Sequence, residues 1–172
     1  MKFKFVNFLT FENWKLGIEN LETMFSLKTI IWLLVFLLFS HIVATVYHLY
    51  WLFPWFDIPM HFLGGFLLAI IFFYLWRFAH ISIGTSVSPA PPRSLAGLPL
   101  ANVFVALVLT LGFVALIGVL WEFYEFLHDF YFLTGGKINV FQTSFADTIK
   151  DLFFDLVGGI TAFAIFYRKL GK

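Results

Sequence analysis

Carboxylate and histidine side chains recur at helical spacing in three apolar stretches, FDIPMHFLGG (56–65), WEFYEFLHD (121–129) and DTIKDLFFDLVGG (147–159). Side chains three, four or seven residues apart lie on one face of a helix. Three helices can therefore direct carboxylates toward one point, where the like charges must be protonated, exposed to water or neutralised by a shared cation. The candidates are Asp57, His61, Glu122, Glu125, Asp151 and Asp155.

This ligand set predicts a divalent metal site. Carboxylate oxygens suit Mg²⁺, Mn²⁺ or Ca²⁺, and an imidazole also admits Zn²⁺ or Fe²⁺. Glu125 and His128 have the Glu-x-x-His spacing that is found in the metal sites of helix bundles. His61, Glu125 and His128 are the candidates for a general base beside the metal.

A structural interpretation remains open for several of these residues. Asp57 can cap the start of a helix, and His61 can be a hydrogen-bonded core residue. Asp129 and Asp147 can be interfacial charges that face water. Asp155 is harder to explain in this way, because an ionisable residue inside a membrane span is a functional candidate by default.

The elements that carry these residues are predicted to be membrane-spanning helices. Of the 172 residues, 61% are hydrophobic and 12% are charged, whereas soluble domains have about 25% charged residues. Stretches of about 20 mostly apolar residues are long enough to span a bilayer, and four are present at about 29–49, 58–78, 100–120 and 148–167. The predicted fold class is all-α, a polytopic membrane bundle of four transmembrane helices.

Segments outside the spans divide the chain further. In the N-terminal segment 1–26, residues 12–25 carry apolar and charged residues at helical spacing, which predicts an amphipathic helix that either lies at the membrane interface or packs on the loops of the bundle. The remainder, 27–172, is predicted to be a single transmembrane domain with a flexible cytoplasmic loop at 82–99, rich in Ser, Pro and Gly. The first helix is expected to end at Pro54, and His41, in the middle of it, is expected to be a hydrogen-bonded packing residue.

Lysine and arginine residues predict the orientation. Most of them lie before the first span, in the loop at 82–99 with its flanks, and at the C-terminus, and only Lys137 and Lys150 lie on the other side. The positive-inside rule then places both termini in the cytoplasm and the carboxylate cluster at the extracytoplasmic face of a plasma (inner) membrane. The net charge of +1 and the absence of cysteine exclude a nucleic-acid surface, disulfides and thiolate metal sites.

Two stretches suggest a parallel internal repeat. DIPMHFLGGF (57–66) aligns with DLFFDLVGGI (151–160), which matches two acidic or histidine positions and a glycine pair. Paired glycines allow helix backbones to approach closely in lipid. Two hairpins could then be related by an axis along the membrane normal. Extending the alignment pairs His48 with Glu122, which makes His48 a further candidate for the site.

The same stretches, in this order, resemble the small multi-pass proteins of the YjdF type, an uncharacterised family of bacterial inner-membrane proteins. They are more distantly similar to VanZ-like proteins, where Asp-Lys-x-x-His, a glutamate on a middle helix and Asp-x-x-x-Asn-x-x-Gly recur. Ile58 and Asp155 stand where that pattern has Lys and Asn, so the YjdF type is the better match. The resemblance covers roughly residues 40–165 and leaves the reaction open. The signature positions that it implies are Asp57, His61, Glu122, Glu125, Asp151 and Asp155.

Three function classes fit these observations. The first is a metal-dependent enzyme that acts on a lipid or lipid-linked substrate, with the metal activating water or a phosphoryl oxygen. The second is a non-catalytic membrane protein whose polar cluster stabilises the bundle or binds a ligand or partner. The third is an ion or solute transporter that works as an oligomer, because the inner halves of the second and fourth spans are apolar.

Overall fold

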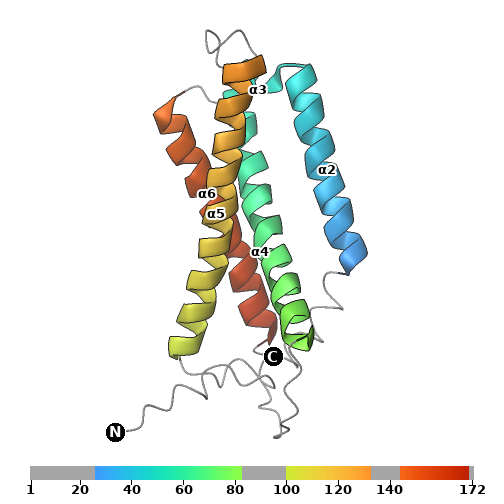
Figure 1. The fold of residues 1–172 in the computed structure, drawn as a ribbon, viewed down its shortest axis with the longest axis vertical. Coiled ribbons are helices and arrows are strands. Elements are labelled where there is room, and N and C mark those ends of the chain that lie inside the picture. Colours follow the sequence, from blue (N-terminus) through green and yellow to red (C-terminus); the bar gives the residue numbers. More distant parts are fainter. Residues whose placement is uncertain (1–25, 83–99, 133–143, 171–172) are drawn as a thin grey trace, which may run out of the picture.

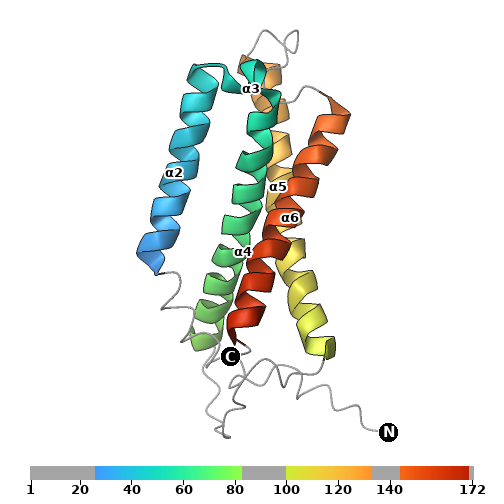
Figure 2. The same cartoon turned by 180° about the vertical axis from the view of Figure 1, so that it is seen from behind.

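The computed structural model describes residues 26–82, 100–132 and 144–170, and all regular structure in these ranges is helical. The predicted interfacial helix within residues 1–26 and nearly all of the loop at 82–99 lie outside the described residues. Four long helices run roughly along one axis (Figures 1 and 2). The elements are α2 (Leu27–Val46), α3 (Leu49–Leu52), η2 (Pro54–Phe56), α4 (Asp57–Ser82), α5 (Leu100–Phe132) and α6 (Phe145–Leu170).

Within the described ranges, three segments are long and apolar enough to cross a membrane: Leu27–Val46, Pro54–Trp76 and Val103–Tyr131. They correspond to the first three predicted spans, although the helix at the third continues to Phe132. The fourth predicted span lies in α6, which is not among the helices that are long and apolar enough to cross a membrane. Four ionisable residues fall within the first eleven positions of α6. The membrane-spanning role of α6 therefore stays a prediction, as does the internal repeat.

The connection between α2 and α4 differs from the prediction. α2 begins after Ser26, whose hydroxyl accepts a hydrogen bond from the Thr29 amide at 3.2 Å, and it ends at Val46 rather than at Pro54. His48 has a left-handed backbone with φ of 54°, which interrupts the α-helical path. Pro54 instead opens η2, where its missing amide hydrogen costs no helical hydrogen bond.

Close contact between α4 and α6 depends on one glycine from each helix. A Cβ atom at Gly65 would overlap the backbone of Asp155, and one at Gly158 would overlap the backbone of Phe62. The predicted approach of the two helices through glycine is therefore confirmed at these positions. Gly159 instead faces the side chain of Val114 on α5. The backbone contacts at Gly65 and Gly158 fix the position of Asp155 along the axis of α4.

An apolar core fills the bundle on the side of these glycines away from α3. Its buried residues come from α2, α4, α5 and α6, and the rings of Phe73 and Phe166 meet edge to face with centroids 4.8 Å apart. α2 is the least integrated of the four helices, since Ile30 and Ala44 are its only buried residues. The core residues are Ile30, Leu67, Ala69, Ile70, Phe73, Val114, Ala162 and Phe166.

Candidate functional site

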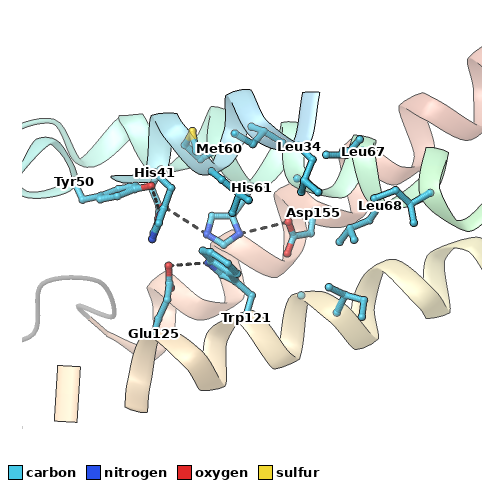
Figure 3. A pocket seen from close by; sticks show the side chains of 17 residues that line it. Leu34, His41, Tyr50, Met60, His61, Leu67, Leu68, Trp121, Glu125 and Asp155 are labelled. Atoms are coloured by element: carbon cyan, nitrogen blue, oxygen red, sulfur yellow. Dashed lines mark hydrogen bonds and ion pairs between the residues drawn. The ribbon is translucent and has the colours of Figure 1, made fainter. Parts of the chain in front are cut away.

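His61 on α4 is the centre of a buried polar cluster near the end of the bundle where α3 lies (Figures 1 and 3). Its Nε2 atom lies 3.4 Å from Oδ1 of Asp57, one turn earlier on α4. Its Nδ1 atom lies 3.4 Å from Oδ1 of Asp155 on α6, and the two side chains are only 5% and 6% exposed. Carboxylates on both sides of the ring hold the imidazole in one orientation.

Asp57 is the first residue of α4, but it is not a conventional helix cap. Its backbone is already helical, with φ of −64° and ψ of −39°, whereas an N-cap residue has an extended backbone. Its carboxylate reaches His61 on its own helix and lies 3.5 Å from the ammonium of Lys150 on α6. Asp57 thus connects α4 with α6, and the capping interpretation does not describe it.

Lys150 is the cationic member of the cluster. Its Nζ atom lies 2.6 Å from Oδ1 of Asp147, one turn earlier on α6, and 3.3 Å from Oδ1 of Asp151. Together with Asp57, these contacts place one ammonium among three carboxylates. Asp147 is therefore ion-paired, rather than a charge that only faces water.

Two glutamates enter the cluster from α5. Glu122 and Glu125 are both buried. The indole Nε1 of Trp121 donates a hydrogen bond to Oε1 of Glu125 at 2.9 Å, across one helical turn. Gly118 lies one turn before Glu122 on α5. A Cβ atom at Gly118 would come within 2.6 Å of Oδ2 of Asp155. A glycine at this position leaves room for the carboxylate between α5 and α6.

In the part of the chain that the structure describes, two overlapping groups of three side chains could each hold a metal ion. In each group, the three ligand atoms all lie within 4.8 Å of one another, and ligands on opposite sides of one ion are separated by about 4 to 5 Å. The imidazole of His61 belongs to both groups, and Asp155 is joined to them through His61. The groups are Asp57–His61–Asp151 and His61–Glu122–Glu125.

Two histidines that the sequence singled out lie elsewhere. His128 belongs to neither of the groups found among the described residues. Its side chain is 25% exposed, and its Nδ1 atom lies 3.9 Å from Oδ1 of Asp129. His48 is exposed in the linker between α2 and α3. Asp129, in contrast, is buried, which favours the alternative to the interpretation of a charge that faces water.

A cavity of about 250 Å³ adjoins the cluster, and residues of α2, α3, α4, α5 and α6 line it (Figure 3). Its polar end includes His61, Glu125 and Asp155, together with His41 from α2 and Tyr50 from α3. The rest of its wall is apolar. The aliphatic lining comes mainly from Leu34, Leu37, Leu38, Leu67, Leu68 and Ile71.

His41 and Tyr50 form the wall of the polar end that faces α4 and α5 (Figure 3). Nδ1 of His41 lies 2.9 Å from the Tyr50 hydroxyl, and the imidazole meets the ring of Trp121 edge to face at 5.1 Å. Burial raises the pKa of the Tyr50 hydroxyl, and the nearby carboxylates of Asp57 and Glu125 raise it further. The hydroxyl is therefore protonated and can donate a hydrogen bond. The prediction that His41 is hydrogen-bonded is confirmed.

Sequence reasoning assigned no site role to Lys150, Trp121, His41 or Tyr50. Signals for the first two existed, because Lys150 follows Asp147 by three residues and Trp121 precedes Glu125 by four. The pair of His41 and Tyr50 left no such signal. These two residues lie nine positions apart across the left-handed turn at the end of α2.

The three apolar spans and the polar cluster at one end of the bundle define a helical membrane protein. The chain belongs to the family described as "Predicted membrane protein (DUF2238)", whose model matches residues 19–172. The comparisons found no match among curated proteins or solved structures. Family membership and the apolar helices agree on residence in a lipid bilayer.

Proposed function

We propose that the buried cluster binds a divalent cation at the extracytoplasmic face of a plasma (inner) membrane. The observation that carries this proposal is the position of His61, which is shared by two groups of potential ligands from three helices. The carboxylates of the cluster outnumber its cationic groups, and buried like charges repel strongly at low dielectric. A bound cation would relieve this repulsion.

The second ligand group is the better place for the ion. Lys150 already lies within 3.5 Å of Asp57 and Asp151, so an ammonium occupies the first group. Glu122 and Glu125 join His61 from the side of α5. With one imidazole and two carboxylates, this group suits Mn²⁺, Zn²⁺ or Fe²⁺ and also admits Mg²⁺ or Ca²⁺.

We further propose that the protein is a metal-dependent enzyme acting on a lipid or lipid-linked substrate. A bound ion would polarise a phosphoryl oxygen or activate water. Glu125 lines the cavity beside His61, which favours it as the general base, whereas His128 is not among the residues that line the cavity. The resemblance to YjdF-type proteins, and more distantly to VanZ-like proteins, supports the same signature positions.

A non-catalytic role is the second candidate. The ion pairs of Lys150 with three carboxylates, and of His61 with two, are contacts that would join α4 to α6 without a metal. Transport by an oligomer has less support. On the far side of Gly65 the buried ionisable residues of the cluster are followed by an apolar core, and the hydroxyl of the buried Thr110 donates a hydrogen bond to the carbonyl of Ala106 on its own helix.

The test is metal analysis of the purified protein. The protein in detergent is stripped with a chelator, reloaded separately with Mg²⁺, Mn²⁺, Ca²⁺, Zn²⁺ or Fe²⁺, and measured by elemental mass spectrometry and calorimetry. We expect stoichiometric binding of at least one ion, weakened about tenfold or more by Glu122→Gln because one ligand charge is lost.

Asp147→Asn is the matched control, because Asp147 pairs with Lys150 and belongs to neither ligand group. It should bind the ion much more tightly than Glu122→Gln does, because it keeps every proposed ligand. If no tested ion binds stoichiometrically to the wild type, the metal site is wrong and the ion-pair network is the better account of the cluster.

A further inference from the structure

The cavity beside the cluster is amphipathic along its length. Its polar end is lined by ionisable and hydrogen-bonding side chains, and leucine and isoleucine side chains from α2 and α4 line the rest. In Figure 3, His41, Tyr50, His61, Trp121 and Glu125 lie toward one end of the cavity, while Leu67 and Leu68 lie further along α4. A ligand that matches this cavity has a polar group joined to a hydrocarbon chain.

The side of the cavity formed by α2 is not closed by packing. Leu34 and Leu38 line the cavity and are nevertheless 41% and 46% exposed. α2 is itself apolar enough to span a membrane, so the medium around it is hydrocarbon. A chain inside the cavity can therefore continue between α2 and its neighbours into the bilayer.

The volume also favours a ligand that is only partly enclosed. Pockets that enclose a whole small-molecule ligand usually measure about 300 to 1,000 Å³, and this cavity has about 250 Å³. That volume accommodates a head group and the first part of a chain. The remainder of the chain would lie in the bilayer.

The polar end indicates what kind of head group fits. The protonated hydroxyl of Tyr50 and the imidazole of His41 are hydrogen-bonding groups on the side of α2 and α3, opposite Glu125 and His61. Without a cation, the carboxylates would repel an anionic head. With a divalent cation on Glu122, Glu125 and His61, the same end presents a metal and the hydrogen-bonded pair of His41 and Tyr50, which can turn one donor toward a phosphate oxygen.

We propose that this cavity binds a lipid that carries a phosphate in its head group, with the phosphate between the cation, His41 and Tyr50 and the chain along Leu34, Leu37 and Leu38. The lipid enters laterally from the bilayer, past α2. This inference rests on the proposed cation site, and it adds His41 and Tyr50 as binding residues for the substrate.

Native mass spectrometry of the purified protein in detergent tests the proposal with three probes of matched chain length: phosphatidic acid, a polyprenyl phosphate and diacylglycerol, which lacks phosphate. We expect one or both phosphate-bearing lipids to bind in the presence of the ion, with preference between them identifying the lipid class. Diacylglycerol should bind much more weakly. Equal retention of diacylglycerol and both phosphate lipids would overturn the assignment of the head group.

Two Leu→Trp variants locate the bound chain. Leu38→Trp adds bulk inside the cavity and should reduce lipid occupancy severalfold. Leu116→Trp makes the same change on α5 at a residue that is 60% exposed and does not line the cavity, and it should bind lipid as the wild type does. If the two variants lose lipid equally, or neither loses any, the cavity is not the binding site.

Tyr50→Phe probes the head group separately from the metal. We expect it to weaken binding of the phosphate lipid about fivefold, the effect of losing one hydrogen bond, with metal content unchanged. Unchanged affinity for the phosphate lipid would show that the Tyr50 hydroxyl does not bind the head group.

The same preparations separate failure of this inference from failure of the proposed function. Metal-loaded protein that binds no lipid overturns the lipid site and leaves the cation site intact. Lipid that stays bound with unchanged affinity in chelator overturns the role of the cation and supports the cavity alone.

Discussion

His61 on α4 and Asp155 on α6 form a buried cross-helix pair, with Nδ1 of the imidazole 3.4 Å from Oδ1 of the carboxylate. The backbone of Asp155 packs directly against Gly65, one turn beyond His61. The polar pair and the glycine contact therefore lie at the same level of the bundle. Changes at either one should disturb the other.

Asp155→Ala should destabilise the protein by about 2 kcal/mol, because the buried imidazole of His61 loses one of its two carboxylate partners and keeps only Asp57. The free energy of unfolding is measured in detergent with chelator present, so that metal binding does not contribute. In a double-mutant cycle, His61→Ala with Asp155→Ala should cost less than the sum of the single changes.

Asp147→Ala is the control for this measurement, since its partner Lys150 is 30% exposed. We expect Asp147→Ala to lower the free energy of unfolding by less than about 1 kcal/mol. A fully additive cycle between His61 and Asp155 would show that the two side chains do not interact in solution.

Gly65→Ala should prevent normal packing of α4 against α6, because the added methyl group would overlap the backbone of Asp155 and neither helix can move away locally. We expect loss of the monodisperse peak in size-exclusion chromatography and a large drop in melting temperature. Gly112→Ala is the matched control, because a Cβ atom there meets nothing within 4 Å. It should leave both measurements unchanged or slightly raise the melting temperature.

Helical periodicity explains why much of the site could be predicted. Apolar runs identified the helices, and the i, i+4 spacing of Asp57 with His61 and of Asp151 with Asp155 placed each pair on one helix face. The glycines after each pair indicated where the two helices approach. These signals are local in sequence, and the predicted residues other than His48 and His128 are brought together in the described structure.

The turn that ends α2, and the side chains that it positions, could not be predicted from helical periodicity. The left-handed conformation of His48 ends α2 eight residues before Pro54 and turns Tyr50 back toward His41. The same break leaves His48 exposed instead of in the cluster. His128 shows a second limit, because Glu-x-x-His spacing places two residues on one helix face but does not determine whether both face the same partner helix.

Tyr50 should give the protein a pH dependence above about pH 10. Burial raises the pKa of its hydroxyl in the folded state, so the unfolded chain loses this proton first as the pH rises. The stability that comes from the protonated hydroxyl is complete below the unfolded pKa and is lost as the pH rises toward the folded pKa. The measurement is the melting temperature from pH 8 to pH 11.

Tyr50→Phe should have a shallower decline in melting temperature than the wild type over this range. Tyr131→Phe removes a hydroxyl from a side chain that is 70% exposed, and its slope is the reference with which that of Tyr50→Phe is compared. Identical slopes for the wild type and Tyr50→Phe would show that the Tyr50 hydroxyl does not titrate differently in the folded state.

Lys150→Met separates the metal site from a network of ion pairs. The substitution removes the ammonium that lies within 3.5 Å of Asp57 and Asp151, so carboxylate repulsion increases and the metal-free protein should melt at a lower temperature. The same loss of positive charge should make a divalent cation bind about tenfold more tightly, equivalent to about 1.4 kcal/mol. Titration calorimetry, and melting curves with and without the ion, measure both effects.

Lys28→Met is the control, because Lys28 lies on α2, outside the cluster, and its removal should alter neither quantity. A cation site predicts that saturating metal restores the melting temperature of Lys150→Met, since the ion replaces the missing positive charge. A network held by ion pairs alone predicts a lower melting temperature that no divalent ion restores. The second result would show that the ion pairs of the cluster stabilise the bundle and that no divalent cation binds there.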